Sequence, residues 1–537
     1  MEAKIKNIVH WSLPVVFVVL INFLVYWPAL FHAARGDQII FLKHTAKSGS
    51  LSEMLSDELS YTRAAQTQRG DDILFRPVLD TALVLQRWWY GCQFWKWQLT
   101  AIIIHLLVLF QMRRLMNLVE KSHLGWLFIA NFSIFYIGQE MVIWQHISFY
   151  MVSLLLLVEA FLYFFRYLYF PQKYPLSLWK AVFFLTAASL IFEFGLVVDL
   201  IMVFGLLAIR SGWIPWLKTR GPSILLRDII ILGTPIVIYM LLSASDYCFH
   251  HLGSIQNSLP AISWQEFIFR CLCTLLLLID AAAFPVFIQI KPLGRSLMEF
   301  FDWSRIPVQV KLHPWLASMD FLMVVLLVIL IIKMTASPKN SSSIEHWLDE
   351  KKQRLSMIKT MGWFTLTLAV GYLVMLIVGR SRQPFFYIQI SLYHFYMIGF
   401  LLSVCAFSFW SLHHSLANDR GDLQKNLLSA VLITSILLNA SQSFAFNLDL
   451  KEQYWPWARF MGKIDSFVMS HKKEDGFSFD IIWQPSSSSM QKLKRGETVY
   501  RYQYQPYFAP FVNKKDPKYL LLYKEDGDSL TEASKSM

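Results

Sequence analysis

The sequence predicts an all-α polytopic membrane protein with about eleven transmembrane helices, outer-face loops and a small C-terminal extramembrane α+β region. Of the 537 residues, 55% are hydrophobic and only 16% are charged, whereas a soluble domain carries about 25% charged residues. The apolar residues form long runs, and the cations that give a net charge of +12 lie mostly between these runs. This composition excludes a disordered chain, a fibrous repeat and a nucleic-acid-binding domain.

The first apolar run predicts a permanent span rather than a cleaved signal. It extends from Ile8 to Phe31 and follows Lys4 and Lys6. A signal peptide has an apolar core of about 7–15 residues that ends in a small-residue cleavage site. This run is longer and ends in bulky residues, so we expect it to remain in the membrane with the N-terminus in the cytoplasm.

Ten further apolar runs are long enough, or nearly so, to cross a bilayer as helices. They lie near residues 97–115, 124–139, 143–165, 179–193, 196–210, 229–246, 319–335, 360–379, 390–412 and 425–446. If the chain crosses at each run, one side of the membrane collects Arg113, Arg114, Lys121, Arg166, Lys173, Arg210, Lys218, Arg220, Arg227, Lys339, Lys351, Lys352, Arg354, Arg420 and Lys425. The positive-inside rule makes that side the cytoplasm.

One apolar segment is expected not to cross. Residues 267–290 contain Arg270 and Asp280, and a crossing there would move the cationic loop at 336–359 to the outside. We therefore predict a re-entrant or interfacial helix on the outer side, packed on protein or lining a cavity.

The resulting organisation places most extramembrane chain on the outer face. Residues 1–446 form the transmembrane domain, with outer loops at 33–96 and 247–318, and residues 447–537 form a C-terminal region outside the membrane. Alternating aromatic and polar residues from Val499 to Tyr504 predict a strand in that region. Chemistry is therefore expected on the exterior or lumenal face.

Ionisable residues near membrane depth are costly, so each one is a functional hypothesis. Arginine offers a planar fork for phosphate oxygens, and a neighbouring carboxylate can take a proton from an attacking hydroxyl. The predicted topology gathers acids and arginines of this kind at the outer face. The candidates are Asp37, Arg76, Glu140, Glu193, Arg380 and Arg382, with His105 and Trp144 beside them and Asp71 and Asp72 in the first outer loop.

Each candidate also has a purely structural interpretation. Asp37 could be a solvated loop acid, and Asp71 and Asp72 a solvated charge pair. Glu140 and Glu193 could cap hairpin turns. The remaining structural roles are interfacial anchoring, for Arg380 and Arg382, and interhelical hydrogen bonding, for His105.

The order of several short motifs resembles GT-C glycosyltransferases. Val25-Tyr-Trp-Pro-Ala-Leu30, Gly36-Asp-Gln38, Phe75-Arg-Pro77 and Trp97 to His105 are similar to the N-terminal region of the protein O-mannosyltransferase and transmembrane O-mannosyltransferase branch. Within the same branch, Phe135 to Trp144 resembles an apolar–Pro–Glu–Trp element without its Pro, Ser189 to Glu193 a Ser-Lys-Glu element without its Lys, and Gly379-Arg380 a Gly-Arg pair. The resemblance covers roughly residues 15–210, and 360–412 more loosely.

The resemblance implies transfer of a sugar from a polyprenyl-phosphate donor to an acceptor hydroxyl on the outer face, with inversion. It implies that Asp37 is the catalytic base and that Arg76, Arg380 and Arg382 bind the donor phosphate. Glu140, Glu193, His105 and Trp144 would support the site. The family often has a second acid where this chain has Gln38. A divalent cation at this position would therefore lack one ligand, and no metal or other cofactor is assigned.

Other functions remain open at this stage. The chain could transfer or ligate another lipid-linked group, could be a transporter or flippase, or could be a non-catalytic scaffold. Transporters often contain internal repeats, and none is visible in the sequence. The expected partners are the polyprenyl-phosphate sugar, a glycan, lipid or protein acceptor, and the bilayer, with no nucleic acid. The short cytoplasmic loops favour a bacterial inner membrane, with the endoplasmic reticulum as the alternative.

Overall fold

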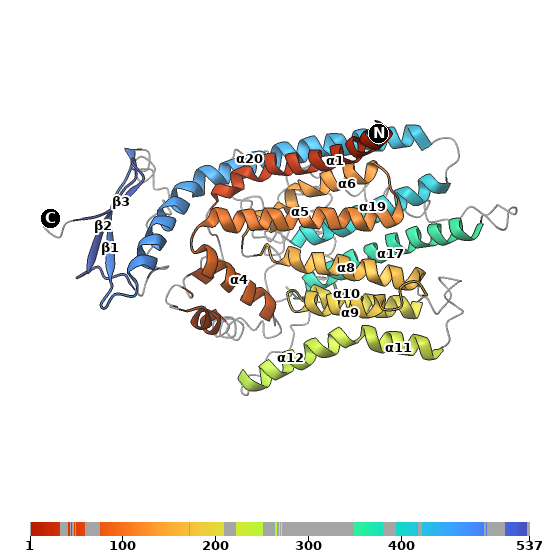
Figure 1. Ribbon diagram of the computed structural model, residues 1–537, viewed down its shortest axis with the longest axis horizontal. Coiled ribbons are helices and arrows are strands. Elements are labelled where there is room, and N and C mark those ends of the chain that lie inside the picture. The colour runs from red at the N-terminus through yellow and green to blue at the C-terminus, as the bar shows by residue number, and fades with distance from the viewer. Residues whose placement is uncertain are drawn as a thin grey trace. The chain divides into compact units, whose positions relative to one another are not determined.

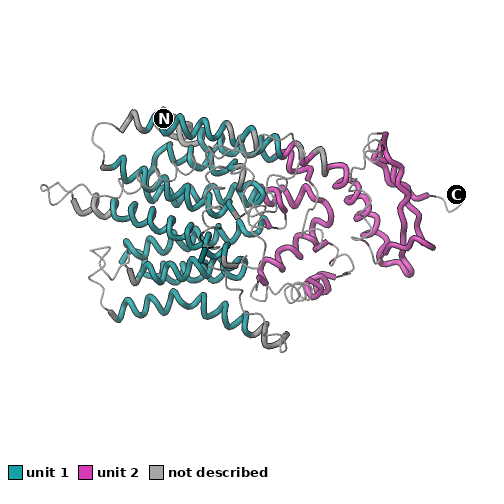
Figure 2. The backbone as a smooth tube through the Cα atoms, turned by 180° about the vertical axis from the view of Figure 1, so that it is seen from behind, with its two compact units in different colours: residues 1–26, 103–142, 148–446 teal, residues 27–102, 143–147, 447–537 magenta. Residues whose placement is uncertain are grey.

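A computed structural model describes residues 2–32, 41–42, 45, 48, 50–58, 76–145, 147–170, 172–208, 222–250, 264–265, 268, 270, 348–379, 394–416, 421–487, 490, 508 and 511–533. Figure 2 shows that the chain divides into two compact units. The first unit comprises residues 1–26, 103–142 and 148–446, and the second comprises residues 27–102, 143–147 and 447–537.

The first unit is a bundle of helices that run alongside one another (Figure 1). Its elements are α1 (Glu2–Tyr26), α5 (Phe94–Val119) from residue 103 onward, α6 (Leu124–Ser133), η2 (Tyr136–Gln139), α7 (Glu140–Ile143), α8 (Tyr150–Tyr169), α9 (Ser177–Ser189), α10 (Phe194–Ala208), α11 (Pro222–Leu232), α12 (Thr234–His250), α17 (Leu348–Gly379), α19 (His394–Leu416) and α20 (Gly421–His471) up to residue 446.

The predicted class of polytopic membrane protein is confirmed by the length and apolarity of these helices. Within the described residues, seven helices are long and apolar enough to span a membrane: 13–31, 94–119, 150–169, 223–244, 354–377, 395–415 and 425–448. Three shorter apolar helices occupy 124–133, 177–189 and 194–206. Each of these ten helices overlaps a predicted span, whereas the predicted span at 319–335 lies outside the described residues, as does nearly all of 267–290.

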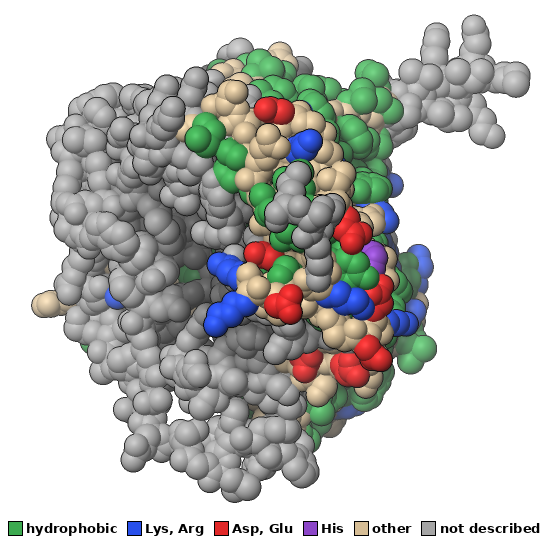
Figure 3. Space-filling model, turned by 90° about the vertical axis from the view of Figure 1, so that its left-hand side faces the viewer, with side chains coloured by type: hydrophobic (Ala, Val, Ile, Leu, Met, Phe, Trp, Pro, Cys, Tyr) green, Lys and Arg blue, Asp and Glu red, His purple; other side chains and the backbone are tan. Residues whose placement is uncertain are grey.

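Large apolar side chains cover the outward faces of these helices. Leu20 on α1 is 62% exposed, Phe204 on α10 is 64% exposed and Leu241 on α12 is 66% exposed. Exposing such apolar faces to water is unfavourable, so they are typical of surfaces that contact lipid. On the face that Figure 3 presents, by contrast, Lys, Arg, Asp and Glu side chains are interspersed on the described surface.

Several helix boundaries differ from the sequence prediction, and two of the differences have clear local reasons. The predicted span at 229–246 is two helices separated at Gly233, because Pro235 has no amide hydrogen and its ring displaces the carbonyl four residues earlier. The predicted span at 124–139 stops being α-helical at Ser133, whose hydroxyl donates back to the Ala130 carbonyl at 2.8 Å. At the other end of the chain, α20 continues to His471, well beyond the predicted end of its span at residue 446.

Contacts within the first unit define two ends of the bundle. At one end, here called the site end, the Tyr26 hydroxyl donates to the Ser133 carbonyl at 3.0 Å, and Ser153 near the start of α8 donates to Ala188 near the end of α9 at 3.1 Å. The opposite end is called the basic end. There, Arg354 at the start of α17 donates to the carbonyl of Val119, the last residue of α5, at 3.3 Å.

The basic end collects cations that the sequence analysis placed on one side. Arg114 on α5 pairs with Glu159 on α8, and Arg166 lies 5.6 Å from the centre of the Tyr163 ring. Arg227 on α11 pairs with Asp228 and donates to Tyr167 on α8. Cations predicted to share a membrane side therefore do lie together, and the acids Glu140 and Glu193 lie on the segments at the opposite end.

The second unit combines helices with a small sheet, as the predicted α+β region requires. It contains η1 (Trp27–Phe31), α4 (Pro77–Tyr90), the first turns of α5 and the last half of α20. The sheet has the order β1 (Phe479–Gln484), β2 (Tyr519–Lys524), β3 (Ser529–Glu532), with β1 parallel to β2 and β2 antiparallel to β3. The strand predicted at 499–504 lies outside the described residues.

Candidate active site

The site end of the first unit holds two of the predicted acidic residues. Glu140 is the first residue of α7 and is half-buried, and Glu193 is half-buried in the turn between α9 and α10. The two helices α8 and α9 form a hairpin: α8 runs away from Glu140, and α9 runs back along α8 toward Glu193. The structure therefore places both carboxylates at the same end of the bundle.

Aromatic contacts join the start of α8 and the turn that holds Glu193 to α17. Tyr150 at the start of α8 stacks on Phe192, which directly precedes Glu193, with ring centroids 4.6 Å apart. Tyr372 on α17 contacts Phe192 and Phe194 edge-on, at centroid distances of 6.2 and 4.7 Å. The last residue of α17 is Gly379, so the helix that leads to the predicted Arg380 ends at the site end too.

His105 lies in a buried polar cluster at the site end. Its Nδ1 is 2.6 Å from the Tyr396 hydroxyl, and its Nε2 is 2.9 Å from the Ser133 carbonyl and 3.1 Å from Asn22 Oδ1. The imidazole is fully buried. With both ring nitrogens engaged, His105 links α1, α5, α6 and α19, which is the interhelical role that the sequence analysis also considered.

Two further predicted residues belong to the second unit. Arg76 is half-buried directly before α4, and its carbonyl accepts the Asp80 amide at 3.1 Å. Pro77 fits the first helical position because its fixed φ suits the helix and its missing amide hydrogen is not needed there. Trp144 is half-buried after α7, and the neighbouring Gln145 side chain donates to the Phe94 carbonyl at 3.3 Å.

The predicted base and the remaining phosphate-binding residues fall outside the described part of the chain. These are Asp37, Arg380 and Arg382, together with Asp71 and Asp72. Their assignment stays a prediction. Among the described residues, no group of three or more His, Cys, Asp or Glu side chains is arranged to hold a metal ion.

The structure also reveals buried acids within apolar helices that sequence reasoning missed. Asp228 on α11 is fully buried, accepts from the Tyr167 hydroxyl at 2.6 Å and pairs with Arg227 at 2.9 Å. Asp199 on α10 is also fully buried, and neither of its carboxylate oxygens has a hydrogen-bond partner among the described residues. The available signal was an acid inside an apolar run.

A buried ion pair in the second unit was likewise missed. Arg87 on α4 pairs with Asp465 on α20 at 3.0 Å, although 378 positions separate them in the sequence. The Cys92 amide also donates to Asp465, at 2.9 Å. Burial alone would raise the pKa of Asp465, but the charge of Arg87 and these hydrogen bonds hold it below its usual value.

Comparisons with known proteins give one structural likeness. No protein-family model matches the sequence, and no curated protein matches it. The chain is similar to the crystal structure of ArnT from Cupriavidus metallidurans bound to undecaprenyl phosphate, with 11% sequence identity and a TM-score of 0.38, over 95% of this chain and 87% of that one. A likeness at this level establishes neither a family nor an activity for the chain.

Proposed function

We propose that the protein is an integral-membrane glycosyltransferase of the GT-C type. In this proposal it transfers a sugar from a polyprenyl-phosphate donor to an acceptor hydroxyl at the outer membrane face. The observation that supports it most directly is the site end of the first unit. Glu140, Glu193 and the last residue of α17, which precedes Arg380, lie at that end of the bundle, opposite the cations of the basic end.

The proposed chemistry is a single displacement. Asp37 accepts the proton of the acceptor hydroxyl while the hydroxyl oxygen attacks the anomeric carbon. The bond from that carbon to the phosphate oxygen breaks, and polyprenyl phosphate leaves with the bonding electrons. Attack opposite to the leaving group inverts the anomeric centre.

Arginine has a specific task in this scheme. Arg76, Arg380 and Arg382 would neutralise the phosphate as negative charge develops on its oxygen, and loss of one such donor commonly costs about 3 kcal/mol in the transition state. The half-buried Glu140 and Glu193 would orient these guanidinium groups or the acceptor. No step requires a metal ion.

The test is transfer from radiolabelled polyprenyl-phosphate monosaccharides by the full chain in nanodiscs, supplied with membranes as the source of acceptor. Asp37→Asn is expected to lower the rate by about 10²–10⁴-fold, because Asn is similar in shape but cannot take the proton. Glu140→Gln and Glu193→Gln are measured beside it.

The matched control is Glu159→Gln, which alters an acid in the middle of α8 in the same unit, where it pairs with Arg114. It is expected to keep near-normal transfer. If only Glu140→Gln or Glu193→Gln loses activity, the base has been assigned to the wrong acid. If all three site variants transfer sugar at the parental rate, the proposed mechanism is wrong.

A further inference from the structure

A pocket of about 750 Å³ lies wholly within the second unit. One wall is a single face of α20, where lining residues recur at helical spacing from Trp455 through Arg459 and Lys463 to Ser466. The other walls are the segment from Cys92 to Trp95 and the β2–β3 hairpin. This volume is in the range of small-molecule sites, about 300–1,000 Å³.

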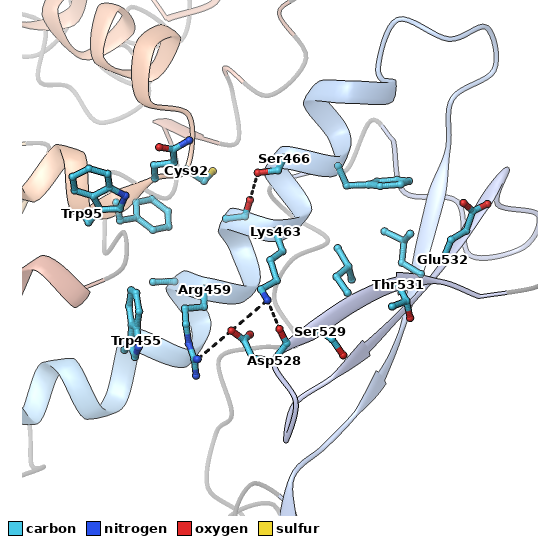
Figure 4. A pocket seen from close by; sticks show the side chains of 17 residues that line it. Cys92, Trp95, Trp455, Arg459, Lys463, Ser466, Asp528, Ser529, Thr531 and Glu532 are labelled. Atoms are coloured by element: carbon cyan, nitrogen blue, oxygen red, sulfur yellow. Dashed lines mark hydrogen bonds and ion pairs between the residues drawn. The ribbon is translucent and has the colours of Figure 1, made fainter.

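Two tryptophans form an aromatic side of the pocket. Figure 4 shows Trp95 and Trp455 on the same side of it. Trp95 is 47% exposed, so its ring is accessible to a ligand. The ring of Trp455 is held edge-on against Phe31 at a centroid distance of 4.8 Å, and the Arg459 guanidinium lies 5.5 Å from its centre.

The polar part of the lining begins beside Trp455 and is held in place by ionic contacts. Arg459 and Lys463 approach Asp528 at 3.1 and 3.3 Å, and Lys463 also donates to the Asp528 carbonyl (Figure 4). The Tyr523 hydroxyl donates to the same carboxylate at 2.9 Å. Asp528 has a positive φ of 43°, a conformation that Asp tolerates better than most residues. Hydroxyl groups complete the lining, from Ser466, Ser529 and Thr531.

The charges of the lining residues balance. Arg459 and Lys463 are offset by Asp528 and Glu532, so the pocket has no net charge that would select an anion. It offers instead an aromatic surface next to a set of hydrogen-bond donors and acceptors. A pyranose ring has this complementary form, since its C–H face is apolar and its rim of hydroxyl groups both donates and accepts.

We propose that this pocket binds a saccharide, with one pyranose ring against Trp95 and Trp455 and its hydroxyl groups on Arg459 and Asp528. Naming that saccharide as the acceptor rests on the proposed function. Binding itself does not, because none of the described residues assigned to transfer lines the pocket.

The first measurement is binding of the full chain in nanodiscs to an array of neutral and acidic oligosaccharides. The best-binding glycan is then titrated by calorimetry. Trp95→Ala is expected to weaken its binding at least about tenfold through loss of the stacking surface. Arg459→Lys keeps the charge but removes the planar fork, and is expected to weaken binding as well.

The matched control is Trp89→Ala. Trp89 lies on α4 in the same unit, is 67% exposed and does not line the pocket. It should leave affinity unchanged. Inorganic phosphate is added as a competitor, and displacement of the glycan by millimolar phosphate would identify an anion site and overturn the proposal. Absence of binding to every glycan, or equal affinity of Trp95→Ala and the parent, would also overturn it.

Failure of this inference can be told apart from failure of the proposed function. Asp37→Asn should bind the glycan with parental affinity even when transfer is lost. If a glycan binds but receives no sugar from any polyprenyl-phosphate donor, the saccharide-binding site stands. Its role as the acceptor site is then refuted. Loss of glycan binding alone says nothing against transfer at the site end.

Discussion

Replacing Asp465 by Asn should loosen the second unit locally. The exchange keeps an oxygen that can accept the Cys92 amide but leaves the Arg87 guanidinium without its counter-ion. Both side chains are buried, with 4% and 9% of their surfaces exposed, so water cannot replace the lost partner. The neighbouring Gly91 has a positive φ of 54°, and a Cβ atom there would lie 2.5 Å from Asp465, so the turn has little room to rearrange.

The size of the effect follows from the burial of the pair. Removing one partner of a buried ion pair typically costs about 3–5 kcal/mol, because the remaining charge is uncompensated. Each 1.4 kcal/mol changes an equilibrium about tenfold. The opening equilibrium of the segment around Cys92 should therefore increase by about 10²–10⁴-fold in Asp465→Asn. Replacing both partners, as in Arg87→Met with Asp465→Leu, should recover most of the loss.

Labelling of the Cys92 thiol measures how often the segment around it opens. The thiol is buried, and burial raises its pKa, so the closed state holds almost no reactive thiolate. With Cys248, Cys271, Cys273 and Cys405 replaced by Ala, the rate of maleimide labelling is proportional to the opening equilibrium when reclosing is fast.

Asp480→Asn, in β1 of the same unit, is the control and should change the labelling rate only slightly. Labelling of Asp465→Asn within about threefold of the parent would refute this account of the ion pair.

Two further predictions concern pH and topology. The pKa of Asp465 is lowered in the folded protein, so its stabilising effect is complete above the unfolded value of about 3.9 and is lost as the pH falls through the folded pKa. Fluorescence melting curves of parent and Asp465→Asn should differ at pH 7 and begin to converge only below about pH 4, meeting once the pH is below the folded pKa. Reporter fusions at Ser342 and Asn513 should lie on opposite sides of the membrane, with Asn513 outside, and finding both on one side would contradict the predicted topology.

The sequence by itself determined the class of protein and the positions of its spans. Whether a stretch such as Tyr150–Tyr169 can cross a bilayer depends on its own length and apolarity, and these are local properties. The grouping of Arg114, Arg166 and Arg354 at one end was predictable for a related reason, since alternating spans assign each loop to a side. Helix ends were less predictable, because the break at Gly233 depends on a few local backbone contacts.

Only the tertiary structure decided which distant residues meet. Arg87 and Asp465 are ordinary charged residues in the sequence, and their pairing exists because α4 packs against α20. In the same way, Trp95, Arg459 and Asp528 come from three separate segments, so no spacing rule brings them together. His105 could be recognised as a polar residue in an apolar helix, but its partners Tyr396 and Asn22 follow only from the packing of the bundle. Side-chain contacts across a fold depend on how whole helices and strands are placed, whereas a span depends only on its own residues.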